Sequence, residues 1–135
     1  MKKISSKENQ LVFSAEIDES LANAIRRYLS QIPVVAIDEV EISKNDSPLY
    51  DETISQRLGL IPLKMPSGSV KDKDFKLKLV SGTEGFVKSG EIKGEVKIVY
   101  NEMPITFLNK GQEIELTAIA RTGRGTQHSK FTPGL

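Results

Sequence analysis

The sequence contains no cysteine and only one histidine, His128, among its 135 residues. Without cysteine, this chain forms no disulfide, holds no iron–sulfur cluster through thiolates and offers no cysteine-containing zinc site. Acidic and basic residues are nearly balanced, with 18 Asp and Glu against 19 Lys and Arg. The resulting net charge of +1 creates no overall field that would draw the protein onto nucleic acid or anionic lipid. Any contact with nucleic acid therefore needs a local basic patch.

Long apolar runs are also missing. The first ten residues, MKKISSKENQ, turn polar where the apolar core of a secretion signal would stand. No later run approaches the roughly 20 apolar residues that a membrane-spanning helix requires. The sequence therefore predicts a cytoplasmic protein without a membrane partner.

The residue types needed for catalysis are scarce. No serine stands in a G-x-S-x-G setting, and a single histidine leaves no recognisable pair of nucleophile and base. Acidic residues gather at Asp38, Glu39 and Glu41 and again at Asp51 and Glu52, but neither group has the spacing of a metal-binding loop. We expect no catalytic residue, no metal site and no cofactor. A hydrolase centred on Asp38 and Glu41 ranks last among the alternatives.

The first quarter of the chain predicts a strand and an amphipathic helix. Residues 11–17 alternate with a period of two, which is typical of a half-buried strand. Asp18 or Ser20 is suited to cap the helix that follows, and Pro33 ends it because the residue before a proline is disfavoured in the α region. Spacings of three and four place the apolar side chains on one stripe, which consists of Leu21, Ile25, Tyr28, Leu29 and Ile32.

Residues 34–42 predict a second strand. Its alternation changes phase near Asp38 and Glu39, which indicates a β-bulge. After a turn, Ser47 and Pro48 suit the N-cap and the first position of a short helix. We expect Gly59 to end that helix from the C′ position.

The second half of the chain predicts a sheet. Residues 60–74 contain two prolines and several small polar residues, which are typical of a connector. After it, four segments have the alternation of strands in an antiparallel sheet, namely 75–80, 94–100, 105–108 and 112–120. The periodicity stops at residue 121.

The strand–helix–strand piece at the front is too small to cover its own apolar side chains. A two-stranded unit is marginal in water without further strands or a helical partner. We therefore expect the stripe to be covered either by chain beyond Leu135 or by another protein.

Two adjacent arginines, Arg26 and Arg27, belong to the helix that carries the stripe. At about 100° per residue, Arg27 points nearly opposite the stripe alongside Asn23 and Ser30, while Arg26 lies on the flank. A solvated polar face is the ordinary explanation of such a pattern. The alternative is a helix contacted on both sides, with the arginines reaching carboxylates or carbonyls of a partner.

Residues 121–130, RTGRGTQHSK, form a basic segment that contains Arg121, Arg124, His128 and Lys130. Its glycines would let the backbone approach phosphates closely, but no aromatic stacking platform is nearby and the glycines do not connect a strand to a helix. A nucleic-acid-binding loop, a protein-contacting loop and a merely exposed basic loop all stay open.

Three stretches resemble the D-subunit family of archaeal DNA-directed RNA polymerase. They are LANAIRRYLSQIPVVAIDEVEI (21–42), NDSPLYDETISQRLGLIPLK (45–64) and ARTGRGTQHSKFTPG (120–134). They occur in this order and span nearly the whole chain. That family is related to the N-terminal domain of the bacterial alpha subunit and to the third-largest subunit of eukaryotic polymerase II.

The resemblance implies an α+β fold with two subdomains. Residues 1–45 would form the strand–helix–strand part of an alpha-like dimerisation subdomain, incomplete here, and residues 46–135 an inserted, mainly antiparallel β subdomain ending in the basic loop. Family members usually continue past the position of Leu135, so we expect this chain to lack the C-terminal part of the dimerisation subdomain. Some members also carry cysteine-ligated iron–sulfur clusters, which a cysteine-free chain cannot hold.

The resemblance also implies a function in transcription. Members of the family do no chemistry themselves; they pair with subunit L, and the pair is the platform for the large catalytic subunits B and A of this nucleotidyltransferase complex, with the small subunits N and P attached. A separate C-terminal D-subunit fragment is a further expected partner, and no sequence-specific DNA contact is expected. The main alternative is a small β-rich nucleic-acid-binding module that uses residues 121–130.

Two sets of site residues follow from the resemblance. The dimerisation interface would be the stripe itself, Leu21, Ile25, Tyr28, Leu29 and Ile32. The contacts with the large subunits would be made by Asn23, Arg26, Arg27, Arg57, Leu60, Ile61, Arg121, Arg124, His128 and Lys130.

Overall fold

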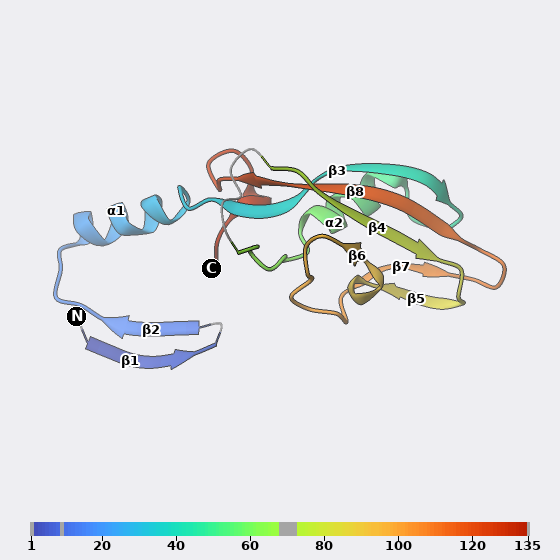
Figure 1. Ribbon diagram of the computed structural model, residues 1–135. Helices are drawn as coiled ribbons and strands as arrows, with labels where there is room; N and C mark the ends of the chain where they lie inside the picture. The colour runs from blue at the N-terminus through green and yellow to red at the C-terminus, as the bar shows by residue number, and fades with distance from the viewer. Residues whose placement is uncertain (1, 9, 68–72, 135) are drawn as a thin grey trace.

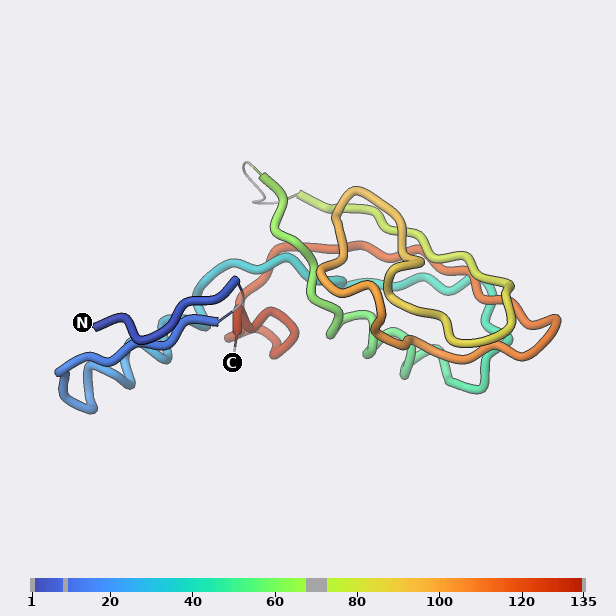
Figure 2. Tube along the Cα trace, turned by 90° about the horizontal axis from the view of Figure 1, so that it is seen from below, coloured from blue at the N-terminus to red at the C-terminus, as the bar shows by residue number. Residues whose placement is uncertain are grey.

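The computed structural model describes residues 2–8, 10–67 and 73–134 of the chain. Figure 1 shows two parts, an N-terminal hairpin and helix on the left and a larger β-rich body on the right. The view in Figure 2 shows the same arrangement, with the C-terminal segment at the junction of the two parts.

The described chain contains helices and antiparallel strands, which confirms the α+β class. None of its helices has the length and apolar content of a membrane span. In chain order the elements are β1 (Lys2–Lys7), β2 (Gln10–Ser14), α1 (Glu19–Leu29), β3 (Val34–Asn45), α2 (Asp51–Gly59), β4 (Phe75–Ser81), β5 (Gly85–Lys88), the 3₁₀ turn η1 (Ser89–Glu91), β6 (Lys93–Gly94), β7 (Pro104–Leu108), β8 (Ile114–Gly123) and the 3₁₀ turn η2 (Ser129–Phe131).

The largest sheet has the strand order β3-β8-β4-β6, and its neighbouring strands are antiparallel. Side chains alternate along its strands: in β4, Phe75 and Leu77 are buried, whereas Lys76 and Lys78 are exposed. The period-two pattern of the sequence predicted this strand. A sheet that is apolar on one face needs a cover on that side.

That cover comes from α2 and from the small antiparallel sheet of β5 and β7. Ile54 and Leu58 of α2 are fully buried, and so are Val87 of β5 and Ile105 and Leu108 of β7. All five belong to one apolar cluster with the buried side chains of the large sheet. Burial of each such side chain stabilises the fold by about 1.5–3 kcal/mol relative to exposure. The β-rich body is therefore closed by its own residues.

The sequence signals at the start of α1 are confirmed. Asp18 is the N-cap residue, because its Oδ1 accepts a hydrogen bond from the N–H of Leu21 at 2.9 Å. The helix ends at Leu29, earlier than the end that Pro33 predicted, so Ile32 of the stripe lies in the turn that follows α1. The predicted bulge in β3 is also present as a register shift between residues 37 and 39.

The predicted ends of the second helix were wrong. Tyr50, and not Ser47, is the N-cap residue of α2. Ser47 instead binds Asn45, whose Oδ1 accepts hydrogen bonds from the backbone N–H of Ser47 at 3.1 Å and from the Ser47 hydroxyl at 2.6 Å. This Asx-type turn delays the helix by one turn. At the other end, Gly59 is the last helical residue and Leu60 is the C-cap.

The predicted strand over 94–100 was wrong for most of its length, because β6 contains only Lys93 and Gly94. The early end of β6 is caused by the residue that follows it, Glu95. The carboxylate of Glu95 accepts a hydrogen bond from the N–H of Lys76 at 2.8 Å, and so occupies a β4 donor that a longer β6 would have used. After that point the chain turns irregular and buries alternate apolar side chains in the core.

Strand β8 runs to Gly123, three residues beyond the predicted end, so Arg121 lies in the sheet and not in a loop. Strand β3 pairs with it from Val34 opposite Gly123 to Asn45 opposite Ile114. Strand β1 was not predicted at all, because its polar sequence KKISSK has no alternating apolar pattern.

Residues 124–134 fold back against the junction of the two parts. Phe131 is buried, and its ring lies so close to Gly123 that a Cβ there would come within 2.6 Å of the ring. Gly125 approaches the end of α1, where a Cβ would lie 3.3 Å from the Cβ of Ser30. The bare backbone at these glycines lets the segment contact both the sheet and the helix end.

We expect Gly123→Ala to lower the free energy of unfolding by about 1–3 kcal/mol, because the added methyl group overpacks the Phe131 ring. Gly134→Ala is the matched control, since no atom lies within 4 Å of a Cβ at that position. It should change stability by less than about 0.5 kcal/mol. Denaturant unfolding of the full chain measures both, and equal stability of the two variants would show that Phe131 does not pack on Gly123.

Candidate subunit interface

The apolar stripe of α1 lies on the surface. None of the 11 residues of α1 is buried. The exposed fractions of the stripe residues lie between 45% for Ile25 and Ile32 and 73% for Tyr28. A surface helix of a globular domain normally packs such a stripe against the core. Within the described part of the chain, nothing buries it.

The β1–β2 hairpin adds further exposed apolar side chains. Every residue of β2 is exposed. A two-stranded hairpin on its own is marginal in water. Together with the stripe, these side chains make up what we term the N-terminal apolar surface: Ile4, Leu11, Val12, Phe13 and Ile17 with Leu21, Ile25, Tyr28, Leu29 and Ile32.

Exposure of so many large apolar side chains is costly in water. Moving one of them fully out of water stabilises a protein by about 1.5–3 kcal/mol. Soluble monomers rarely expose contiguous apolar patches larger than a few hundred Å². The N-terminal apolar surface therefore indicates contact with another polypeptide segment.

The two arginines on the other side of α1 are in different states. The guanidinium of Arg26 donates to Oδ1 of Asn23 from Nε at 3.2 Å and from Nη2 at 2.7 Å, so it is held on its own helix. Arg27 lines a hollow of about 390 Å³ with Gln31 and with Thr126 of the C-terminal segment. No ion-pair partner of Arg27 is present among the described residues. Arg27 is therefore the arginine that is free to bind a partner.

The predicted contact residues near the end of α2 also differ from one another. Arg57 donates from Nη1 to the carbonyl oxygens of Pro104 and Ile105, at 3.4 and 3.3 Å. Leu60 is 57% exposed and is available to a partner. Ile61 is only 3% exposed in the chain's own core, so its side chain offers almost no surface to another subunit.

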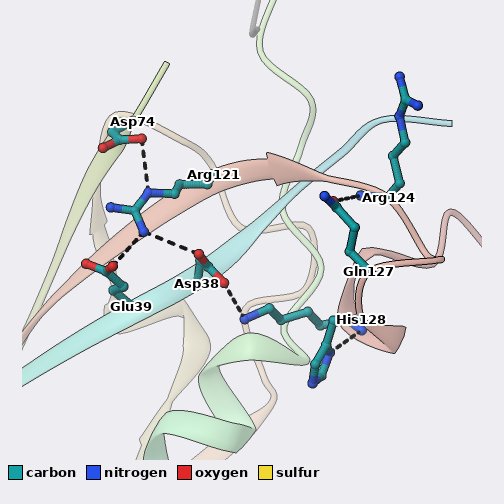
Figure 3. Close-up of polar contacts among 8 residues, drawn as sticks. Asp38, Glu39, Asp74, Arg121, Arg124, Gln127 and His128 are labelled. Carbon is teal, nitrogen blue, oxygen red and sulfur yellow. Dashed lines mark hydrogen bonds and ion pairs between the residues drawn. The ribbon is translucent and has the colours of Figure 1, made fainter. Parts of the chain in front are cut away.

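Arg121 stands at the centre of an ion-pair cluster that joins three parts of the chain (Figure 3). Its Nη1 lies 2.7 Å from Glu39 and 3.3 Å from Asp38, both on β3, and its Nε lies 3.2 Å from Asp74 just before β4. Lys130 of η2 binds the other oxygen of Asp38 at 2.8 Å. The cluster thereby ties the C-terminal segment to the sheet.

Contacts within this cluster shift the pKa of Asp38 and the pKa of Arg121. The hydrogen bond from Lys130, helped by the positive charges of Lys130 and Arg121, holds the pKa of the Asp38 carboxyl below its ordinary value against the opposing effect of partial burial. Hydrogen bonds to Glu39, Asp74 and Asp38 raise the pKa of the Arg121 guanidinium further above its ordinary value. The Asp38 carboxyl and the Arg121 guanidinium are thus both charged at neutral pH.

The remaining predicted residues of the basic segment lie apart from the cluster. The backbone N–H of Arg124 donates to the side-chain oxygen of Gln127 at 2.9 Å, and the Arg124 guanidinium points away from the cluster in Figure 3. The Nδ1 of His128 accepts a hydrogen bond from the N–H of Lys130 at 3.0 Å. Of the four predicted residues, Arg121 and Lys130 are therefore already paired with carboxylates of the same chain.

The acidic residues Asp38 and Glu39 of β3, considered above as metal ligands, lie next to basic side chains. Asp38 and Glu39 bind Arg121 and Lys130, which neutralise their charge. Throughout the described ranges, no three His, Asp or Glu side chains are grouped so as to hold a metal ion.

Sequence reasoning missed the role of three acids in this arrangement. Asp38, Glu39 and Asp74 are separated by up to 36 positions in the sequence but surround one guanidinium. The only available signal was the bulge in β3, which turns both Asp38 and Glu39 outward as exposed residues.

We expect Asp38→Asn to lower the free energy of unfolding at pH 7 by about 1 kcal/mol, the range of a half-exposed ion pair. Because the pKa of Asp38 is depressed in the folded state, its stabilisation is complete above the ordinary aspartate pKa of 3.8 and is lost as the pH falls toward the depressed value. Urea unfolding between pH 7 and pH 3 measures this, with the exposed Glu41→Gln as control. A difference that persists at the acidic end would contradict the ion-pair origin.

Comparison with known proteins gives one family and several relatives. The family model described as "RNA polymerase Rpb3/RpoA insert domain" matches residues 15–133. The DNA-directed RNA polymerase subunit Rpo3 of Pyrococcus horikoshii is 39% identical over 140 residues, which cover 95% of this chain and 54% of that protein. Rpo3 of Thermococcus kodakarensis is 41% identical over 130 residues, covering 88% and 50%, and Rpo3 of Pyrococcus furiosus is 38% identical over 144 residues, covering 98% and 55%.

The chain thus spans about half the length of the curated relatives it matches. The matched range contains α1, β3, α2 and the whole β-rich body. The similarity to archaeal Rpo3 proteins agrees with the resemblance to the D-subunit family that the three sequence stretches indicated. This chain belongs to the RNA polymerase Rpb3/RpoA insert-domain family.

Proposed function

We propose that this chain acts as the non-catalytic D-type assembly subunit of an archaeal DNA-dependent RNA polymerase. It pairs with subunit L, and the pair forms the platform on which the large subunits B and A assemble, with subunits N and P as further partners. The single observation that carries this proposal is the N-terminal apolar surface, because no described residue of the chain covers it. An assembly subunit needs such a surface, whereas an independent domain does not.

The two parts of the chain have different roles in this function. Residues 1–45 contribute the pairing surface, and residues 46–135 form the inserted subdomain that faces the large subunits. Strand β3 connects the two, because it leaves α1 and then pairs with β8 over its whole length. The chain therefore passes from the pairing helix directly into a central strand of the body.

The polar side of α1 supports contact with a second partner. Arg27 has no ion-pair partner among the described residues, and guanidinium groups bind carboxylates in a geometrically specific way. Arg26 is bound to Asn23 on the same helix. A helix with an exposed apolar stripe on one side and an arginine without an ion-pair partner on the other fits a position between two subunits.

The nucleic-acid-binding alternative has less support. It depends on the positive charges of residues 121–130, but Arg121 and Lys130 are paired with Asp38, Glu39 and Asp74. Binding to phosphates would have to break these pairs, which reduces its gain. Arg124 alone does not make a basic patch.

We expect Ile25→Asp to weaken binding to subunit L of the same organism by at least about 30-fold, because a carboxylate would be buried in an apolar interface at a cost of about 2 kcal/mol or more. Val80→Asp is the matched control, since Val80 is an aliphatic residue of β4 with 59% exposure, far from α1 in the chain. Isothermal calorimetry or co-purification measures the affinity. Full binding by Ile25→Asp would refute pairing through the stripe.

We expect Arg27→Ala to reduce incorporation of the large B-type subunit into the reconstituted polymerase about tenfold or more, because a free guanidinium that binds a partner carboxylate is removed. The neighbouring Arg26→Ala supplies the control, since it deletes the same charge from the same helix. Pairing with subunit L should stay intact in both variants. Equal losses of B-type subunit incorporation in Arg26→Ala and Arg27→Ala would contradict the proposal that the unpaired guanidinium of Arg27 binds the partner.

A further inference from the structure

An apolar groove of about 680 Å³ lies on the β-rich body beside the end of the stripe. Residues 32–36 form one wall, residues 60–63 with Met65 the second, and residues 129–130 with 132–134 the third, with Val99 and Tyr100 completing the lining. Ile32 belongs both to this groove and to the stripe, so the two surfaces are continuous.

The groove carries more exposed apolar side chain than a solvated surface needs. Leu60 is 57% exposed, Met65 48%, Tyr100 49% and Val99 38%. Pro62 and Pro133 also line it and donate no backbone hydrogen bond. These properties suit an occupant with aliphatic side chains.

Two lysines, Lys64 and Lys97, lie next to the lining of this groove without belonging to it. Leu63 and Ile98 form an isolated antiparallel bridge, flanked by hydrogen bonds from Lys64 N to Lys97 O at 2.8 Å and from Val99 N to the Pro62 carbonyl at 3.1 Å. The bridge residues are buried, so their neighbours point outward. Lys64 and Lys97 therefore stand opposite each other on the same outward face as the groove-lining Pro62 and Val99.

Like charges directly opposite each other on two strands destabilise the pairing. In the described ranges, no carboxylate forms an ion pair with Lys64 or Lys97. The only charged residue in the groove lining is Lys130, whose ammonium is already bound to Asp38. The two lysines beside the groove thus lack an ion-pair partner among the described residues, and an acidic group of an occupant would supply one.

The wall formed by β3 also has a backbone donor with a weak acceptor. The N–H of Val35 donates to the thioether sulfur of Met65 at 3.3 Å. Thioether sulfur accepts hydrogen bonds only weakly, and the flexible methionine side chain adapts to different neighbours. A carbonyl oxygen of an extended peptide would be a stronger acceptor for this N–H.

We infer that the groove binds an extended segment of a partner protein whose aliphatic residues lie along the groove and whose Asp or Glu reaches Lys64 and Lys97. The inference rests on the proposed function in that the partner is another subunit of the polymerase. It adds a second contact, which adjoins the stripe at Ile32, and states the chemistry of the segment that binds there.

A photocrosslinker in the assembled enzyme tests this. The full chain carrying Val99→p-benzoylphenylalanine is reconstituted with the other polymerase subunits of the same organism, irradiated, and the adduct is mapped by mass spectrometry. We expect an adduct to one protein segment with at least two aliphatic residues and an Asp or Glu within about four positions. The same crosslinker at Leu60, a second exposed residue of the lining, should label the same segment. Agreement between the two positions excludes a local effect of the Val99 substitution.

Charge reversal supplies the second measurement. Lys97→Glu should reduce the adduct yield about fivefold, and adding Lys64→Glu should reduce it further, because attraction becomes repulsion. Lys110→Glu is the control: Lys110 is an exposed turn residue outside the groove lining, and its reversal should leave the yield unchanged.

The inference is overturned by the absence of an adduct from both positions, by an adduct to nucleic acid or to a segment without an acidic residue, or by equal effects of Lys97→Glu and Lys110→Glu. Pairing with subunit L is measured in the same samples. If pairing persists while the groove gives no acidic adduct, only the groove assignment fails; if the wild-type chain does not pair, the proposed function fails as well.

Discussion

The unburied stripe of α1 is the constraint on which the rest of the structure depends. A helix of 11 residues with a complete apolar side must place that side against something, and the described residues provide nothing. Apolar burial is the largest favourable term in folding and association. The stripe is exposed while the β-rich body closes its own core through Ile54, Leu58 and the strands around them. Among the described residues, the β-rich body thus has its own core, whereas the stripe of the helix that extends from it is uncovered.

How the helix is held relative to the body depends on the C-terminal segment. Phe131 packs on the bare backbone of Gly123, and Lys130 is tied to Asp38, so the segment is fixed to the sheet by both an apolar and a charged contact. The same segment places Gly125 against the end of α1. Two of the charges in the basic segment, on Arg121 and Lys130, are therefore paired with carboxylates of the same chain. The N-terminal apolar surface, in contrast, is exposed.

The two surfaces proposed to bind partners have one physical property in common, which is that they carry groups without a partner in the described part of the chain. On α1 the unsatisfied groups are the stripe and the guanidinium of Arg27. In the groove they are exposed apolar side chains next to the opposed lysines Lys64 and Lys97. Arg26 shows the opposite case, because Asn23 already satisfies it. Residue type alone does not separate these cases, whereas the contacts within the fold do.

The sequence by itself determined the elements whose signals are local. The Asp18 cap, the stripe, the β3 bulge and the alternation in β4 all depend on neighbouring residues, so they could be predicted. The surplus of apolar surface at the front of the chain also followed from spacing and length. Tertiary structure decided the features in which groups from distant parts of the sequence compete for one hydrogen-bond donor or gather around one charge. Glu95 ended β6 by occupying a donor of β4, and Asp38, Glu39 and Asp74 converged on Arg121 only because β3, β4 and β8 became neighbours.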